Sequence, residues 1–352
     1  MTPPTKPHSA HEAAADSVKM TFENNGLALQ LFGSHHSNLA RVEAKLGISV
    51  NAVGNEVTLY GETAAIEIGR AALEGLYARL EKGLDVTRDE VDALLRMTSQ
   101  PNGNIADADI QVKTKKRRIS PRSPAQADYL RAIDDNELVF GLGPAGTGKT
   151  YLAVAKAVER LVNGDVDRII LSRPAVEAGE QLGFLPGDMQ EKIDPYLRPL
   201  YDALHDMLPG AQVVRRMESG EIEVAPLAFM RGRTLANAFV ILDEAQNTTA
   251  VQMKMFLTRL GENARMVVTG DLSQVDLPRG TRSGLRDAYE ILGGIEGVAF
   301  QHFTHEDVVR HHLVSKIVQA YDKEEARRNA SSRYEKMGTG ASAIATHKDN
   351  DA

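Results

Sequence analysis

The sequence contains no cysteine and no apolar run long enough to cross a membrane. The lack of cysteine excludes disulfides and thiolate metal sites, and it agrees with a reducing compartment. A spanning helix needs about 18 to 20 apolar residues, and the start, MTPPTKPHSAHEAAADS, lacks the apolar core of a secretory signal. We therefore expect a cytoplasmic protein without a membrane segment.

Excess positive charge is also missing, because 41 Lys and Arg face 48 Asp and Glu and leave a net charge of −7. Any contact with nucleic acid must therefore come from a local patch. With 352 residues, 42% of them hydrophobic, the chain can bury at least one core and favours two or three domains.

Polar stretches divide the chain into five predicted parts. Residues 1–16 and 323–352 lack hydrophobic periodicity and are expected to be flexible tails. Residues 17–98 form a predicted α+β module, 99–122 a basic linker, and 123–322 an α/β domain with a mostly parallel sheet.

The module has the predicted order strand (ALQLF), helix (38–46), strands (ISVNAV and EVTLYG), and long helix (63–80). This order is similar to a KH-type RNA-binding fold, whose Gly-x-x-Gly loop clamps a nucleic-acid backbone. The matching tetrapeptide is Gly33-Ser34-His35-His36, with His36 in place of the second glycine. The alternative is a module that mediates assembly or binds a protein.

The linker carries six Lys or Arg between Lys113 and Arg122, in KTKKRRISPR. Such a run is either a solvated charge run or, together with His35 and His36, a contact for RNA. Both interpretations remain open on composition alone.

The strongest motif fits the phosphate-loop spacing of Gly, four residues, Gly, Lys and Ser/Thr. Its residues are Gly143, Pro144, Ala145, Gly146, Thr147, Gly148, Lys149 and Thr150. The glycines allow N–H groups to point at phosphate oxygens, and a helix that follows contributes its positive end. We expect Lys149 to pair with the outer phosphates and Thr150 to bind Mg²⁺.

A second motif, VILDEAQNTT, ends a buried strand with two adjacent carboxylates. Asp243 is predicted to bind Mg²⁺ through a water, and Glu244 to polarise the attacking water. Downstream, VVTGDLSQVDLP ends another strand, where Gln274 is a candidate sensor of the γ-phosphate. The sequence has no Asn-Lys-x-Asp guanine-reading motif, so ATP is preferred over GTP.

Several segments together resemble the PhoH-like ATPases of bacteria, over roughly residues 121–321. They include GPAGTGKT, RPAVEAGEQLGFLPGD, APLAFMRGRTL, FVILDEAQNTT and DVVRHHLV. The resemblance implies a single RecA-like core related to superfamily 1 helicases, in which Gln126 is similar to an adenine-reading glutamine. It also implies a homo-oligomer, possibly hexameric, and a link to ribosomal RNA maturation with an endoribonuclease partner and to phosphate starvation.

A full helicase motor needs two sheet domains, and too little chain follows Gln274 for a second one. A neighbouring subunit is therefore expected to complete the site with an arginine. The candidates are Arg310, Arg231, Arg233 and Arg173.

These features predict an oligomeric, Mg²⁺-dependent ATPase coupled to RNA handling. The alternative is an ATP-gated RNA-binding or assembly factor with little turnover. A small-molecule kinase ranks third, because a kinase does not need the water activator Glu244.

Overall fold

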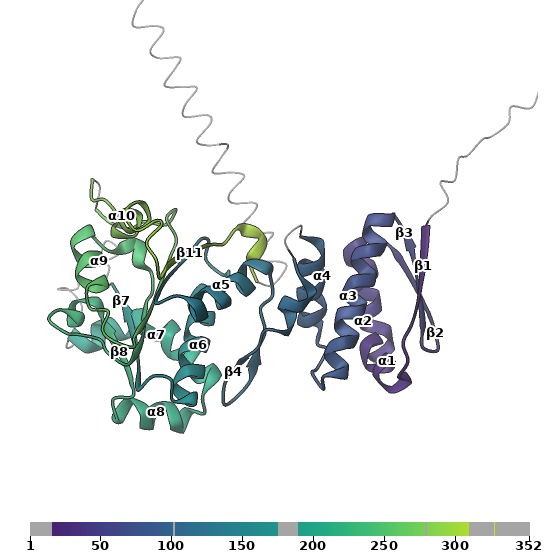
Figure 1. Cartoon of the computed structure of the whole chain (residues 1–352), viewed down its shortest axis with the longest axis horizontal. Helices are drawn as coiled ribbons and strands as arrows, with labels where there is room; N and C mark the ends of the chain where they lie inside the picture. Colours follow the sequence, from purple (N-terminus) through teal and green to yellow (C-terminus); the bar gives the residue numbers. More distant parts are fainter. Residues whose placement is uncertain (1–15, 101–102, 175–188, 279, 310–326, 328–352) are drawn as a thin grey trace, which may run out of the picture. The chain divides into compact units, whose positions relative to one another are not determined.

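The structure is a computed structural model that describes residues 16–100, 103–174, 189–278, 280–309 and 327 (Figure 1). The elements below lie in the first of two compact units, Met1–Asp307. Arg310 and the last residues of the predicted α/β domain, 310–322, lie outside the described residues. Within the described part of the chain, no helix is both long and apolar enough to cross a bilayer.

The N-terminal module packs helices on an antiparallel sheet. In chain order it contains β1 (Asp16–Thr21), α1 (Asn25–Phe32), α2 (Ser37–Leu46), β2 (Ser49–Val53), β3 (Glu56–Gly61), α3 (Thr63–Glu81) and α4 (Arg88–Ser99). The strand order is β1-β3-β2. Its core includes Phe32, Leu59 and Leu73, none of them more than 1% exposed. The predicted small α+β module is therefore present.

One element of this module differs from the prediction. The segment ALQLF is not a strand but the body of α1, which begins after Asn24. The Asn24 side chain accepts hydrogen bonds from the N–H groups of Gly26 (2.9 Å) and Leu27 (3.2 Å), and so caps the helix. The outer strand that this part of the chain supplies is β1, which pairs with β3 on the side opposite β2.

The α/β domain is built on six parallel strands. They are β6 (Leu138–Leu142), β7 (Arg168–Arg173), β8 (Ile222–Pro226), β9 (Ala238–Leu242), β10 (Arg265–Gly270) and β11 (Val298–His302). Their order is β11-β6-β10-β9-β7-β8, and each neighbouring pair is parallel. All six strands therefore end at one edge of the sheet, where the predicted site residues follow β6, β9 and β10.

Helices cover both faces of this sheet (Figure 1). They are α5 (Pro124–Asp135), α6 (Lys149–Asn163), α7 (Met189–Met207), α8 (Gly210–Glu218), α9 (Ala250–Leu257) and α10 (Gly284–Ile291). Successive residues of β10 alternate between two cores, because Val267 belongs to the cluster that includes Leu152 of α6, and Val268 to the one that includes Phe256 of α9. Burial on both faces explains why the central strands β6 and β9 carry no polar side chain.

The basic segment is folded, although the sequence predicted a linker. Strands β4 (Val112–Lys113) and β5 (Arg118–Ile119) form a short antiparallel hairpin, which we call the basic hairpin. Val112 and Ile119 are buried in the core that includes α6. The charged side chains of this hairpin are exposed while its apolar ones anchor it.

Candidate nucleotide site

The phosphate loop joins β6 to α6 in a conformation that glycine alone accepts at its start. Gly143 has φ +141°, and a Cβ atom there would lie 2.3 Å from the carbonyl oxygen of Phe303. Gly148, at the beginning of α6, has φ +85°. Lys149 follows it and donates from Nζ to the carbonyl oxygens of Gly143 (2.6 Å) and Pro144 (2.8 Å). The lysine thus lies across the loop where phosphate oxygens are expected.

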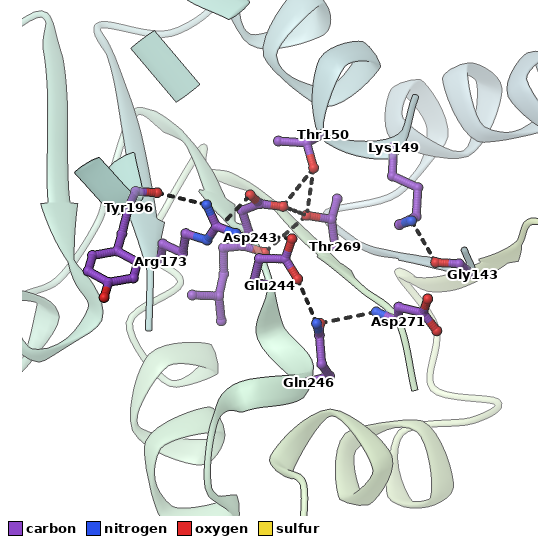
Figure 2. Close-up of polar contacts among 11 residues, drawn as sticks. Gly143, Lys149, Thr150, Arg173, Tyr196, Asp243, Glu244, Gln246, Thr269 and Asp271 are labelled. Atoms are coloured by element: carbon purple, nitrogen blue, oxygen red, sulfur yellow. Dashed lines mark hydrogen bonds and ion pairs between the residues drawn. The ribbon is translucent and has the colours of Figure 1, made fainter. Parts of the chain in front are cut away.

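Three oxygen-bearing side chains meet at the end of β9, as Figure 2 shows. Asp243 Oδ1 accepts hydrogen bonds from Thr150 Oγ1 (2.6 Å) and Thr269 Oγ1 (2.8 Å). Thr150 and Asp243, predicted as the Mg²⁺ residues, are 93 positions apart in sequence and in direct contact in the fold. The parallel strands β9 and β10 end here and α6 begins here, which brings the residues into contact.

A pocket beside these three side chains fits a hard divalent cation. Its lining includes Thr150, Asp243 and Asp271, whose hydroxyl and carboxylate oxygens are the donors that Mg²⁺ prefers. Asp271 Oδ2 is buried and has no hydrogen-bond partner among the described residues. Such an acceptor is costly to bury unless a ligand or water satisfies it, and a hydrated cation supplies suitable donors.

Glu244 lies two residues after the end of β9 and has a left-handed backbone conformation, with φ 52°. Its carboxylate is held from two sides, by Arg173 (3.1 Å) and by Gln246, whose Nε2 donates to Oε2 (2.6 Å). Gln246 also accepts from the N–H of Asp271 (3.1 Å), so one buried side chain ties the ends of β9 and β10. The sequence reasoning gave Gln246 no role, although its place in DEAQ, two residues after Glu244, is a signal.

Arg173 belongs to the site of its own chain. Besides Glu244, it approaches Asp243 (4.0 Å) and donates to the carbonyl oxygen of Tyr196 on α7 (2.7 Å). This placement argues against a role for Arg173 as an arginine inserted into a neighbour's site. Figure 2 shows the guanidinium between α7 and the two carboxylates.

The other candidate arginines are scattered. Arg233 donates through its two terminal guanidinium nitrogens to Glu223 (2.6 and 2.7 Å), and these bonds raise its pKa. Arg231 is exposed. Arg310 lies outside the described residues, so its predicted role stays a prediction.

Gln126 lies behind the phosphate loop, and its predicted contact with adenine stays a prediction. Only 3% exposed, it accepts a hydrogen bond from the N–H of Arg122 (2.7 Å) and donates to the carbonyl oxygen of Thr147 (2.8 Å). Both ends of its amide thus bind backbone, and Gln126 braces the phosphate loop. Gln274 lines the nucleotide pocket with Ala145 and Gly146, where a γ-phosphate sensor is expected.

Comparison with known proteins assigns the chain to a family. The family described as PhoH-like protein matches residues 118–322. A PhoH-like protein of Bacillus subtilis is 49% identical over 312 residues, which cover 88% of this chain and 98% of that protein. This chain belongs to the PhoH-like family. Family membership and the phosphate loop together support a nucleotide-binding ATPase role.

Further relatives show the extent of the match. A PhoH-like protein of Mycobacterium tuberculosis is 50% identical over 318 residues, 89% of this chain and 87% of that protein. Protein PhoH of Escherichia coli is 54% identical over 205 residues, 58% of each chain. A solved SWI2/SNF2 ATPase core of Sulfolobus solfataricus in complex with dsDNA aligns with TM-score 0.28 and 15% identity over 42% of this chain and 31% of that one, too weak to argue from.

Two surfaces of this PhoH-like chain correspond to the predicted RNA contacts. The tetrapeptide Gly33 to His36 connects α1 to α2, and His35 (φ 53°) and His36 (φ 58°) both adopt left-handed conformations. His36 therefore keeps backbone geometry that favours glycine, and its side chain is exposed. On the basic hairpin and its turn, the exposed cations are Lys113, Lys115, Lys116, Arg117 and Arg118.

Proposed function

We propose that this chain hydrolyses ATP with Mg²⁺ and couples hydrolysis to the handling of single-stranded RNA, as part of an oligomer. The observation that carries the ATPase proposal is the meeting of Thr150 and Asp243 at the phosphate loop, with Glu244 next to them. Carboxylates at a strand end beside a phosphate loop are what water-activating NTPases require, whereas a kinase needs an acceptor site.

Each site residue has a defined task in this proposal. The loop N–H groups and Lys149 would bind the phosphates, while Thr150 and Asp243 would hold Mg²⁺, which would supply positive charge beside the outer phosphates. Glu244 orients the attacking water and accepts its proton. Arg173, at 3.1 Å from one carboxylate oxygen, and Gln246 hold Glu244 in place, and each oxygen keeps a second lone pair for the water.

RNA coupling is supported by the exposed cations of the basic hairpin and by the exposed His35 and His36. Electrostatic contacts to phosphates account for most sequence-independent affinity. The test is the ATPase rate with and without single-stranded RNA, measured alongside oligomer mass. We expect stimulation by RNA in the assembled oligomer; an ATPase rate unchanged at every RNA concentration would remove RNA from the proposal.

Assembly would supply the missing arginine, an effect worth about 10³ to 10⁵ in rate in related chemistry. Arg310→Ala subunits mixed with Lys149→Ala subunits test this, because each then lacks a different half of the site. Activity that recovers in the mixture supports an arginine acting between subunits. Absence of recovery excludes Arg310 from that role.

The alternative is an ATP-gated RNA-binding factor with slow turnover. One observation bears on it: Arg173 and Gln246 each bind one carboxylate oxygen of Glu244, so part of the accepting capacity of this carboxylate is used inside the protein. Glu244→Gln separates the two functions in cells. Normal growth with hydrolysis abolished supports the ATP-gated factor. Loss of function with ATP still bound supports the ATPase that couples hydrolysis to RNA handling.

A further inference from the structure

The turn of the basic hairpin is seated on the last turn of α7. The N–H of Lys116 donates to the carbonyl oxygen of Met207 (3.1 Å), and Lys116 Nζ donates to that of His205 (2.8 Å). Between these contacts, Arg117 forms an ion pair with Asp206 Oδ1 (2.6 Å). The hairpin and α7 therefore meet at Asp206.

Asp206 also touches the helix that follows the phosphate loop. Its second oxygen, Oδ2, accepts a hydrogen bond from Tyr151 Oη (2.7 Å). Tyr151 directly follows Thr150 in the first turn of α6. Burial and the bond to Asp206 raise the pKa of Tyr151 to about 12, so its hydroxyl stays a donor at neutral pH. Arg117, Asp206 and Tyr151 thus form a continuous chain of contacts from the hairpin to the phosphate loop.

This chain of contacts forms part of the wall beside the nucleotide pocket. A hollow of about 540 Å³ shares Thr150, Tyr151, Asp243 and Glu244 with that pocket, and its lining adds Asp202 and Asp206. The charge on Asp206 therefore acts on the space next to the bound phosphates. Arg117 partly neutralises that charge as long as the ion pair is intact.

The ion pair is weak enough to be exchanged. The side chains of Arg117 and Asp206 are 51% and 32% exposed, and a pair in such a setting adds little to stability. A nucleic-acid phosphate offers Arg117 an equally good bidentate partner. Once Arg117 turns to a phosphate, Asp206 is left as an uncompensated negative charge that repels the phosphates of ATP.

We propose that Asp206 and Tyr151 are positioning residues that couple the basic hairpin to the nucleotide site, so that a phosphate captured by Arg117 lowers the affinity for ATP. By thermodynamic linkage, ATP lowers the affinity for RNA by the same factor. The inference rests on the proposed function in taking RNA as the ligand of the hairpin. It adds a direction: RNA binding favours nucleotide release.

The first test needs no RNA. Arg117→Gln imitates loss of the ion pair, and we expect the Kd of a non-hydrolysable ATP analogue with Mg²⁺ to rise about fivefold. Arg216→Gln is the matched control, because Arg216 forms a comparable surface pair with Glu221 and lines neither pocket. In an Asp206→Asn background, Arg117→Gln should change the Kd no further. A rise that persists in that background, or no rise at all, overturns the coupling.

The second test adds RNA. A single-stranded oligouridylate should raise the Kd of the same analogue about fivefold in the unmodified protein and leave it unchanged in Asp206→Asn, which removes the charge and keeps Arg117 and Tyr151. Arg118→Gln, on the same hairpin, should weaken RNA binding while the fivefold factor persists at saturating RNA. An Asp206→Asn protein that retains the fivefold factor overturns the relay.

The two tests separate this inference from the proposed function. If Arg117→Gln and Arg118→Gln both bind the oligouridylate as tightly as the unmodified protein, the hairpin is not an RNA site and that part of the proposed function fails. The RNA-free test decides the contact chain through Asp206 and Tyr151 in either case.

Discussion

Gln246→Met tests whether the contacts between the ends of β9 and β10 set the geometry of Glu244. Methionine has a similar volume and lacks strong hydrogen-bonding groups, so the substitution removes two bonds and opens little space. The buried N–H of Asp271 loses its acceptor at 3.1 Å, which costs about 1–3 kcal/mol. The bond to Glu244 at 2.6 Å adds about 1 kcal/mol, because that carboxylate is 37% exposed and water can replace the donor.

The free energy of unfolding should therefore fall by about 2–4 kcal/mol, measured by urea denaturation. The ATPase kcat should fall at least about tenfold, because Glu244 loses one of its two supports, while KM stays close to that of the unmodified protein. Gln246→Glu is the companion variant, since it keeps an acceptor for Asp271 but sets a second carboxylate against Glu244. A Gln246→Met protein with unchanged stability and kcat would refute this reasoning.

Three further results are expected. Tyr129→Phe should leave Tm unchanged or raise it, because the Tyr129 hydroxyl is buried, its pKa is raised by burial, and no described residue is its partner; a lower Tm by thermal denaturation contradicts this. Burial raises the pKa of Asp92, but the hydrogen bond and charge of Arg41 outweigh it and hold the pKa below its ordinary value. The pair therefore stabilises the fold above about pH 4 and less as pH falls through the folded pKa. Asp92→Asn should lower the free energy of unfolding by about 1 kcal/mol at neutral pH, and urea denaturation should show this loss shrinking in acid. A loss that does not depend on pH contradicts the assignment. The log of RNA affinity against log salt should have a slope of about −4 if six cations bind phosphates. The slope should be about −3 if Arg117 and Arg122 keep their carboxylate partners. A flat response would exclude the basic hairpin as an RNA contact.

The phosphate loop and the parallel sheet could be predicted because their signals are local. Gly143 to Thr150 carry the spacing, and the strand before Asp243 is continuously apolar. The contact between Thr150 and Asp243 could be inferred as well, since residues that follow parallel strands reach the same edge of the sheet.

Contacts that depend on the final backbone path could not be predicted. Gln126 is fixed by backbone groups of Arg122 and Thr147, and neither partner is marked by residue type. Arg173 reaches Glu244 because β7 and β9 are neighbours, an order that the sequence does not reveal. The helix α1 was missed because a five-residue apolar run fits a strand or a buried helix equally well, and the capping residue Asn24 was the signal to use.

The most direct test of the central claim is steady-state ATP hydrolysis by Glu244→Gln, with the Kd of Mg²⁺-ATP measured on the same protein. Glutamine keeps the shape of Glu244 and removes its ability to accept a proton. The account predicts a fall in kcat of about 10² to 10⁴ with a Kd within about threefold of the unmodified protein. A Glu244→Gln protein that hydrolyses ATP at the unmodified rate would contradict it.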